Sequence, residues 1–182
     1  MNYITITTAA SLPQLVAAAG QKAATSFLEF FASYIRNAHT RRAYVRAVSE
    51  FLTWCESAGV VSITDVQPLH VATWIEALTQ SLSAPTAKQR LAAVRMLFDW
   101  LVVNQVVPTN PASSVRGPSY SVKRGKTPVL DPAEARTLLD AIDCGTIIGL
   151  RDRALIAMMV YSFARIGAVT GMKIEDVYVQ NR

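Results

Sequence analysis

The sequence predicts a mainly α-helical protein built from two pieces. Apolar side chains recur every three or four positions along much of the 182-residue chain, which is the repeat of a helix with one buried face. The first 107 residues contain no segment with the strict alternation of a half-buried strand. Proline and glycine interrupt the helical pattern over residues 108–130, and this segment therefore separates the two pieces.

The first piece, residues 21–107, is expected to contain four helices. The first helix is predicted over residues 21–36, and the second is predicted to start at Thr40, because threonine is a common N-cap residue. Pro68 and Pro85 suit the first turns of the third and fourth helices, where a backbone amide has no helical partner to lose.

The second piece, residues 131–182, opens with a helix-start pattern. Asp131 is followed by a proline and, three residues later, by a glutamate, as in a capping box. We predict a further helix over residues 150–163 and a shorter one from Ile166. Weak alternation over residues 177–179 indicates the beginning of a strand, so this piece is expected to be mixed α/β.

Basic charge is concentrated between the two pieces. The formal net charge of the chain is +5, and residues 108–130 hold Arg116, Lys123, Arg124 and Lys126 with no acid. An extended basic segment suits a strand that lies along phosphates. The alternative is a solvated linker whose charges only keep it soluble.

Residues 1–20 are expected to be an N-terminal extension.

Two of the predicted helices also carry basic patches away from their apolar faces. Arginine can bind guanine or phosphate through two parallel hydrogen bonds, and threonine and glutamine can bind phosphates or base edges. The alternative is a solvated helix face without a ligand. The candidate DNA-contacting residues are Thr40, Arg41, Arg42 and Arg46 on the second helix, Thr86, Lys88, Gln89, Arg90 and Arg95 on the fourth, and Lys123, Arg124 and Lys126 in the connecting segment.

One arginine stands in an apolar stretch. Arg165 is the only charged residue over positions 160–172. A guanidinium is costly to remove from water unless it meets an anion. It therefore either pairs with a distant acid such as Asp152, extends to solvent, or presents its planar fork to a phosphate.

Composition excludes several classes of protein. Hydrophobic residues make up 51% of the chain and charged residues 17%, which is typical of a folded globular protein. Cys55 and Cys144 are too few and too far apart for a disulfide scaffold or a cysteine zinc site, and His39 and His70 add no metal-ligand spacing. The N-terminus lacks the pattern of a signal peptide, and the apolar run over residues 155–164 is too short to span a bilayer. We expect a cytoplasmic, nucleoid-associated protein with no metal and no membrane contact.

Seven short motifs follow one another in a recognisable order. They are Thr40-Arg-Arg-Ala-Tyr44, Phe51-Leu-Thr-Trp54, the stretch from Thr86 to Arg95, Asn110-Pro111, Gly149-Leu-Arg-Asp-Arg153, Tyr161-Ser-Phe-Ala-Arg165 and Met172-Lys-Ile-Glu-Asp176-Val. In this order they resemble the tyrosine recombinase (phage integrase) family over residues 22–177.

The resemblance implies a four-helix, SAM-like core-binding domain over residues 21–107. Over residues 131–182 it implies the first helices of a truncated, mixed α/β catalytic domain. Such a protein clamps double-stranded DNA at a recombination half-site, together with other recombinase protomers in a synaptic complex, and uses no cofactor. Arg165 would be the first catalytic arginine, which neutralises charge on the scissile phosphate while a tyrosine forms a 3′-phosphotyrosyl link.

The sequence departs from the family pattern at three places. Phe163 and Ala164 precede the arginine where the family usually has glycine and leucine, and Ala168 stands where an acid is common. None of the six tyrosines lies in the context of the family nucleophile. We therefore expect a DNA-binding fragment that is inactive alone. The alternatives are a non-enzymatic short DNA-binding module and a helical interaction module without DNA contact.

Overall fold

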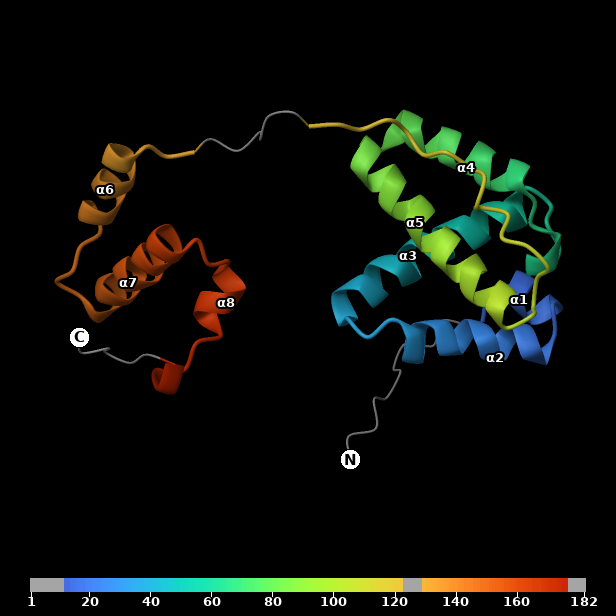
Figure 1. The fold of residues 1–182 in the computed structure, drawn as a ribbon, viewed down its shortest axis with the longest axis horizontal. Helices are drawn as coiled ribbons and strands as arrows, with labels where there is room; N and C mark the ends of the chain where they lie inside the picture. The colour runs from blue at the N-terminus through green and yellow to red at the C-terminus, as the bar shows by residue number, and fades with distance from the viewer. Residues whose placement is uncertain (1–11, 123–128, 177–182) are drawn as a thin grey trace. The chain divides into compact units, whose positions relative to one another are not determined.

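The computed structural model describes residues 12–122 and 129–176, which fold into two compact units, Met1–Ser121 and Val122–Arg182 (Figure 1). Within these described residues the regular structure is helical, with no strand. The predicted mainly α fold is therefore confirmed. The strand expected over residues 177–179 lies outside the described residues.

The first unit contains five α-helices and two short turns of other helix types among its described residues. These are α1 (Gln14–Ala18), α2 (Gln21–Glu29), the π-helical turn η1 (Phe30–Tyr34), α3 (Ala38–Ser57), the 3₁₀ turn η2 (Ile63–Asp65), α4 (Pro68–Ser81) and α5 (Ala84–Val103).

Helix α1 lies within the segment that the sequence indicated as an extension. Its Leu15 and Val16 are fully buried, and α1 packs against α2 and α3. The helix has only five residues, which is shorter than the window in which a helical repeat can be recognised. The folded unit therefore begins before residue 21.

The first predicted helix does not run unbroken to residue 36. The π turn η1 follows α2, and Ile35 then takes an extended conformation with φ −94° and ψ 95°. The wider turn places Phe30 in the core and brings the ring of Tyr34 to 4.9 Å from the ring of Trp100. A single π turn barely changes the apolar spacing, so the sequence did not indicate it.

Helix α3 starts two residues earlier than predicted. Its N-cap is Asn37, whose Oδ1 accepts hydrogen bonds from the backbone amides of His39 and Thr40 at 2.9 and 3.1 Å. The prediction of Thr40 as the N-cap is therefore wrong. Asparagine and threonine both cap helices well, and the side chain that reaches the second and third amides decides between them.

The core of the first unit is centred on the packing of α3 against α5. Phe51 of α3 and Phe98 of α5 are fully buried, with ring centroids 6.4 Å apart. Trp74 of α4 completes this group at 5.0 Å from Phe51. On the other side of α5, the indole Nε1 of Trp100 donates to the carbonyl of Ser26 at 2.8 Å, which ties α2 to α5.

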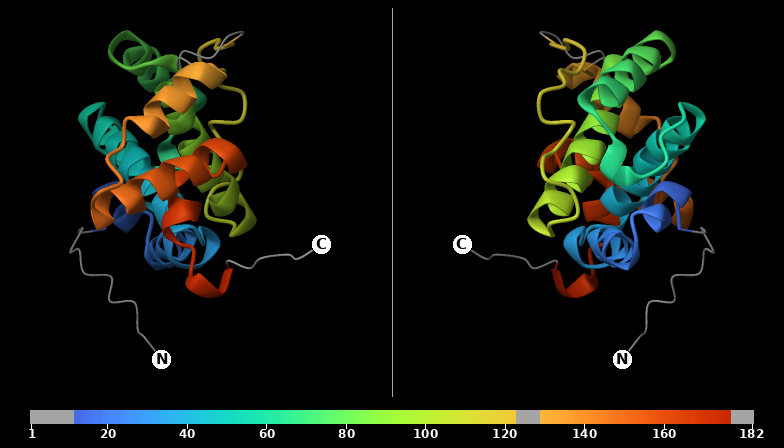
Figure 2. Two further views of the ribbon diagram at one scale, coloured as in Figure 1. Left: turned by 90° about the vertical axis from the view of Figure 1, so that its left-hand side faces the viewer. Right: turned by 90° about the vertical axis from the view of Figure 1, so that its right-hand side faces the viewer.

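After α5 the chain turns back and runs along that helix, as Figures 1 and 2 show. Val107, Ala112 and Val115 are buried in the same core as the helices. The predicted linker over residues 108–130 therefore starts as packed structure. Its prolines and glycines prevent a helix, as expected, but they do not prevent burial.

The second unit consists of α6 (Pro132–Asp140), α7 (Ile147–Ser162), α8 (Ile166–Thr170) and the 3₁₀ turn η3 (Ile174–Asp176) among its described residues. The predicted capping box is present. Oδ1 of Asp131 accepts from the amides of Ala133 and Glu134 at 2.8 Å each, and Oε2 of Glu134 accepts from the Asp131 amide at 2.9 Å.

Helix α7 begins three residues before its predicted start, with Thr146 as N-cap. Gly149 is buried where the preceding turn approaches the helix, and a Cβ there would lie 1.6 Å from the carbonyl oxygen of Asp143. Only glycine fits this position. The apolar residues of α7 are spread around the whole helix rather than along one face. None of the helices in residues 12–122 and 129–176, however, is both long and apolar enough to cross a membrane.

Asn110 fastens the returning segment to α5 with two hydrogen bonds and braces the segment itself with a third. Its Nδ2 donates to the Arg95 carbonyl at 3.0 Å and to the Asp99 carboxylate at 2.6 Å, and its Oδ1 accepts from the Ala112 amide at 2.8 Å. We expect Asn110→Ala to lower the free energy of unfolding by about 1–3 kcal/mol, because partly buried polar groups lose their partners. Urea unfolding of the chain measures this loss.

Asn104→Ala is the matched control for that change. The Asn104 side chain makes one hydrogen bond, to the Trp100 carbonyl at 2.9 Å. Its loss should be clearly smaller than that of Asn110→Ala. Equal losses would contradict the role given to Asn110.

Candidate nucleic-acid interface

Part of the predicted DNA-contacting set lies together on one surface of the first unit. Arg42, Arg46 and Glu50 stand at intervals of four on α3, and Thr86 and Arg90 do the same on the adjoining α5. We call this surface, with Gln89, the α3–α5 face. Arg42 and Arg46 are exposed, whereas Thr86 and Gln89 are half-buried.

Glu50 links the two helices at the centre of this face. Its Oε1 lies 2.8 Å from Nε of Arg46 and accepts from Nη2 of Arg90 at 3.2 Å, while its Oε2 lies 2.9 Å from Nε of Arg90. The side chain of Arg46 is 74% exposed and that of Arg90 is 8% exposed. The sequence analysis did not single out Glu50, although its i,i+4 spacing from Arg46 was a usable signal.

Arg90 was expected on an exposed basic patch, and the structure buries it instead. The contact between Arg90 Nε and Glu50 is close but lacks hydrogen-bond geometry. Gln89 Oε1 accepts from Nη1 of Arg90 at 3.3 Å. Nε2 of Gln89 is buried and has no hydrogen-bond partner among the described residues. One carboxylate thus faces two guanidiniums, which leaves this face net positive.

Two further arginines of the predicted set bind the backbone of the chain itself. Arg41 donates through Nε and Nη2 to the carbonyl of Ile35 at 3.0 and 2.7 Å. Arg95 donates through the same two atoms to the carbonyls of Ala112 and Val115 at 3.2 and 2.7 Å. Both side chains stabilise the fold, which their sequence context did not reveal.

The predicted basic patch on α5 is divided between two sides of the helix. Lys88 and Arg95 are seven positions apart and therefore share one side. Arg90 follows Lys88 by two positions, which turns it by roughly 200° around the helix axis. Thr40 is exposed on the first turn of α3. Lys123, Arg124 and Lys126 lie outside the described residues.

Arg165 occupies the N-cap position of α8 and is exposed. Among residues 12–122 and 129–176 it forms no salt bridge. Asp152, one partner considered for it, accepts two hydrogen bonds from Arg151 instead, at 2.9 and 2.7 Å. Of the three alternatives, the structure removes the pairing with Asp152 and leaves a solvent-facing guanidinium.

The turn that presents Arg165 contains an unusual backbone conformation. Phe163, the C-cap of α7, has φ 54° and ψ 20°, which is the left-handed region, and the residue is 93% exposed. Glycine is the usual residue at such a helix end. The motif that this segment resembles has glycine before its Leu-Arg pair, and Phe163, which departs from it, lies where the chain takes a positive φ.

The cysteine and histidine side chains of the described residues do not indicate a catalytic or metal site. Burial, with a smaller contribution from Glu56, raises the pKa of the Cys55 thiol to about 12, so this thiol stays protonated at neutral pH. His70 Nδ1 accepts from the Gln67 amide at 3.0 Å and serves the start of α4. The part of the chain that the structure describes contains no group of three metal-ligating side chains.

Comparison with known proteins identifies the first unit as a recognised domain. Residues 24–105, from α2 to the end of α5, match the family described as phage integrase, N-terminal SAM-like domain. The fold of the first unit thus belongs to the phage integrase class of SAM-like domains.

Curated relatives extend this match into the second unit. Tyrosine recombinase XerD of Corynebacterium glutamicum is 31% identical over 150 residues, which cover 78% of this chain and 49% of that protein. Tyrosine recombinase XerC of Xanthomonas campestris is 27% identical over 173 residues, which cover 92% and 53%. Tyrosine recombinase XerC of Xylella fastidiosa strain 9a5c is 30% identical over 138 residues, which cover 75% of this chain and 46% of that protein.

The chain belongs to the tyrosine recombinase family. It spans about half the length of the curated relatives it matches. No solved structure matches the chain with comparable significance.

The conformation of Phe163 leads to a stability prediction. Phe163→Gly should stabilise the second unit by about 1 kcal/mol, because a left-handed conformation strains any residue with a Cβ and the exposed ring contributes little packing. Hydrogen exchange of the α7 amides in the whole chain measures the change.

Ala164→Gly provides the control, since Ala164 does not have a positive φ. It should destabilise the same unit by about 0.5–1 kcal/mol through backbone entropy. If both substitutions slowed exchange, or if both accelerated it, strain at Phe163 would not be the cause of the change in stability.

Proposed function

We propose that this chain is the DNA-binding part of a site-specific tyrosine recombinase and that its first unit binds double-stranded DNA at a recombination half-site. The observation that carries the proposal is the net positive α3–α5 face, on the unit that matches the integrase N-terminal domain. The relatives are named tyrosine recombinases, which supports the same reaction class.

Each side chain of the α3–α5 face has a distinct part in this proposal. Arg42 and Arg46 are exposed and can neutralise phosphates. Thr86 and Gln89, at the rim of the buried pair, provide a hydroxyl and an amide that can reach a phosphate or a base edge. Glu50 and Arg90 hold α3 and α5 at a constant separation, so the exposed groups keep their spacing.

The proposal gives Arg165 the role of the first catalytic arginine. Its guanidinium is free to meet a phosphate, and a planar fork can contact two phosphate oxygens at once. It would neutralise the charge that grows on the non-bridging oxygens as a tyrosine hydroxyl attacks the phosphorus and the 5′-oxygen leaves. The resulting 3′-phosphotyrosyl link preserves the bond energy needed for rejoining.

The remaining family features belong to the same proposal. The linker residues Lys123, Arg124 and Lys126 add phosphate contacts, and Arg41 and Arg95 act by holding the backbone that carries the site. Thr40 lies on the first turn of α3, where its hydroxyl is exposed. Other recombinase protomers join in a synaptic complex on nucleoid DNA, without a metal or cofactor.

Loss of one phosphate contact should change the salt dependence of DNA binding. For Arg42→Ala we expect the slope of log K against log salt concentration to become shallower by about 0.9, which is the contribution of one phosphate on duplex DNA. Fluorescence anisotropy with a fixed duplex over a range of KCl concentrations measures the slope.

Arg136→Ala is the control for that measurement. Arg136 is exposed on α6 and the substitution removes the same charge. Its slope should equal that of the unsubstituted chain. Equal slopes for all three proteins would contradict the proposed interface, and a chain that does not bind DNA would overturn the proposed function.

The 182-residue chain should bind DNA without cleaving it, because none of its tyrosines has the context of the family nucleophile. A half-site duplex nicked next to the scissile phosphate traps any covalent intermediate, which denaturing electrophoresis then separates from free DNA. We expect no trapped complex. A covalent complex would show that one of the six tyrosines attacks the phosphate.

A further inference from the structure

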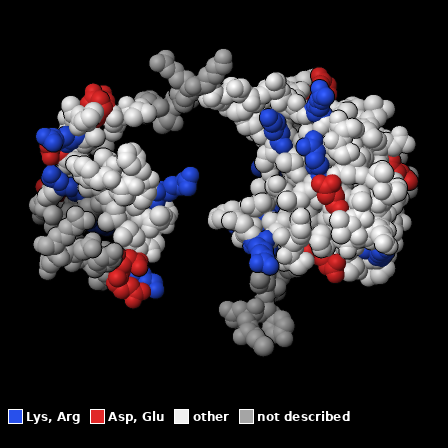
Figure 3. All heavy atoms as spheres, viewed as in Figure 1, with Lys and Arg blue, Asp and Glu red and all other residues white. Residues whose placement is uncertain are grey.

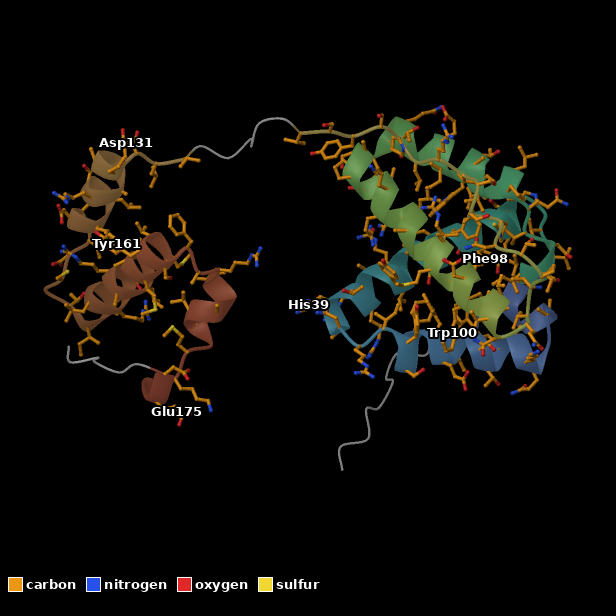
Figure 4. All side chains as sticks on the ribbon, viewed as in Figure 1. His39, Phe98, Trp100, Asp131, Tyr161 and Glu175 are labelled. Atoms are coloured by element: carbon orange, nitrogen blue, oxygen red, sulfur yellow. The ribbon has the colours of Figure 1, made fainter. Side chains whose placement is uncertain are left out.

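A second basic surface lies on the other side of α5 from Arg90. There the chain between Ser113 and Tyr120 crosses the helix and leaves a cleft of about 770 Å³. Lys88, Arg95 and Asp99 of α5 line one wall, and the crossing segment with Arg116 lines the other. Figure 3 shows basic side chains gathered on this side of the first unit.

The cleft has an excess of positive charge. Lys88, Arg95 and Arg116 contribute three cations and Asp99 contributes one anion. The Asp99 carboxylate already accepts a hydrogen bond from Nδ2 of Asn110 at 2.6 Å. An incoming anion would thus meet two uncompensated positive charges, together with the hydroxyl groups of Ser114 and Ser119.

The walls of the cleft are held in place by contacts within the unit. Arg95 binds the carbonyls of Ala112 and Val115, and the Val115 side chain is buried. Gly117 lies directly on α5: a Cβ there would be 3.4 Å from Cγ of Lys88 and 3.3 Å from Cδ2 of Leu91. The crossing segment therefore keeps a fixed distance from the helix, and a ligand does not have to order it.

The cations of the cleft are not committed to other partners. Among the described residues Lys88 and Arg116 form no salt bridge, and both are exposed. Arg95 uses Nε and Nη2 for the backbone, and its Nη1 has no hydrogen-bond partner in the described part of the chain. The cleft therefore offers an ammonium and a guanidinium from opposite walls to one anion.

We propose that this cleft binds one phosphodiester group of the DNA backbone, between Lys88 of α5 and Arg116 of the crossing segment. Arg95 is a positioning residue that keeps the two walls in register. The proposal rests on the proposed function and adds to it a phosphate contact separate from the α3–α5 face, at the point where the chain leaves the first unit.

The first test compares salt slopes for Lys88→Ala, Arg116→Ala and the double variant in the whole chain. Each single variant should reduce the slope of log K against log salt by up to about 0.9. The slope of the double variant should also fall by no more than about 0.9, because both side chains bind the same phosphate. Combination with Arg42→Ala should be additive, because the two surfaces are independent. Arg136→Ala is the control with the same charge change.

The outcomes separate this proposal from the proposed function. Slopes that respond to Arg42→Ala but to neither Lys88→Ala nor Arg116→Ala would overturn the cleft and leave the DNA-binding function in place. A chain that does not bind DNA would overturn both. Unchanged thermal unfolding of the variants establishes that a changed slope reports binding.

The second test distinguishes a DNA phosphate from a free anion. Lysine acylation followed by mass spectrometry should show Lys88 protected by duplex DNA, while Lys173 of the second unit, paired with Glu175, serves as internal reference. Inorganic phosphate at the same ionic strength should give little protection. Equal protection by inorganic phosphate would identify a free-anion site and overturn the assignment to DNA.

Discussion

The packing of α3 against α5 is the interaction on which the rest of the first unit depends. On the inner side Phe51 and Phe98 exclude water, and on the outer side Glu50 meets Arg90. Each helix has 20 residues, so one set of buried contacts fixes the register along its whole length. A close-packed interior resists any sliding of the two helices. The spacing of the exposed cations on α3 and α5 therefore follows from the core rather than from their own interactions.

The arginines of this chain divide into those that hold the fold and those that remain available to a ligand. Arg90 and Arg95 bind a carboxylate and two carbonyls inside the molecule, whereas Arg42 and Arg116 stay in solvent. A buried guanidinium must recover in hydrogen bonds what it loses in hydration, so it fixes its partners firmly. The held arginines give rigidity to the surfaces, and the free ones give those surfaces their charge.

The turn between α7 and α8 in the second unit combines an aromatic residue with a left-handed backbone conformation. Phe163 at the end of α7 takes this conformation, which glycine adopts without strain. The turn then starts α8 with Arg165 at its N-cap, in solvent. The strain of a positive φ at an aromatic residue is the local cost of this turn.

The sequence by itself determined the mainly helical class, the capping box at Asp131, the proline start of α4 and the family, because these depend on interactions within a few neighbouring positions or on motif order. Only the tertiary structure decided that α1 and Val115 belong to the core and which arginines are available. The partners of Arg90 and Arg95 lie 40 and 17 to 20 positions away along the chain. Local patterns carry no information about groups that only folding brings together, so exposure and charge pairing follow from packing.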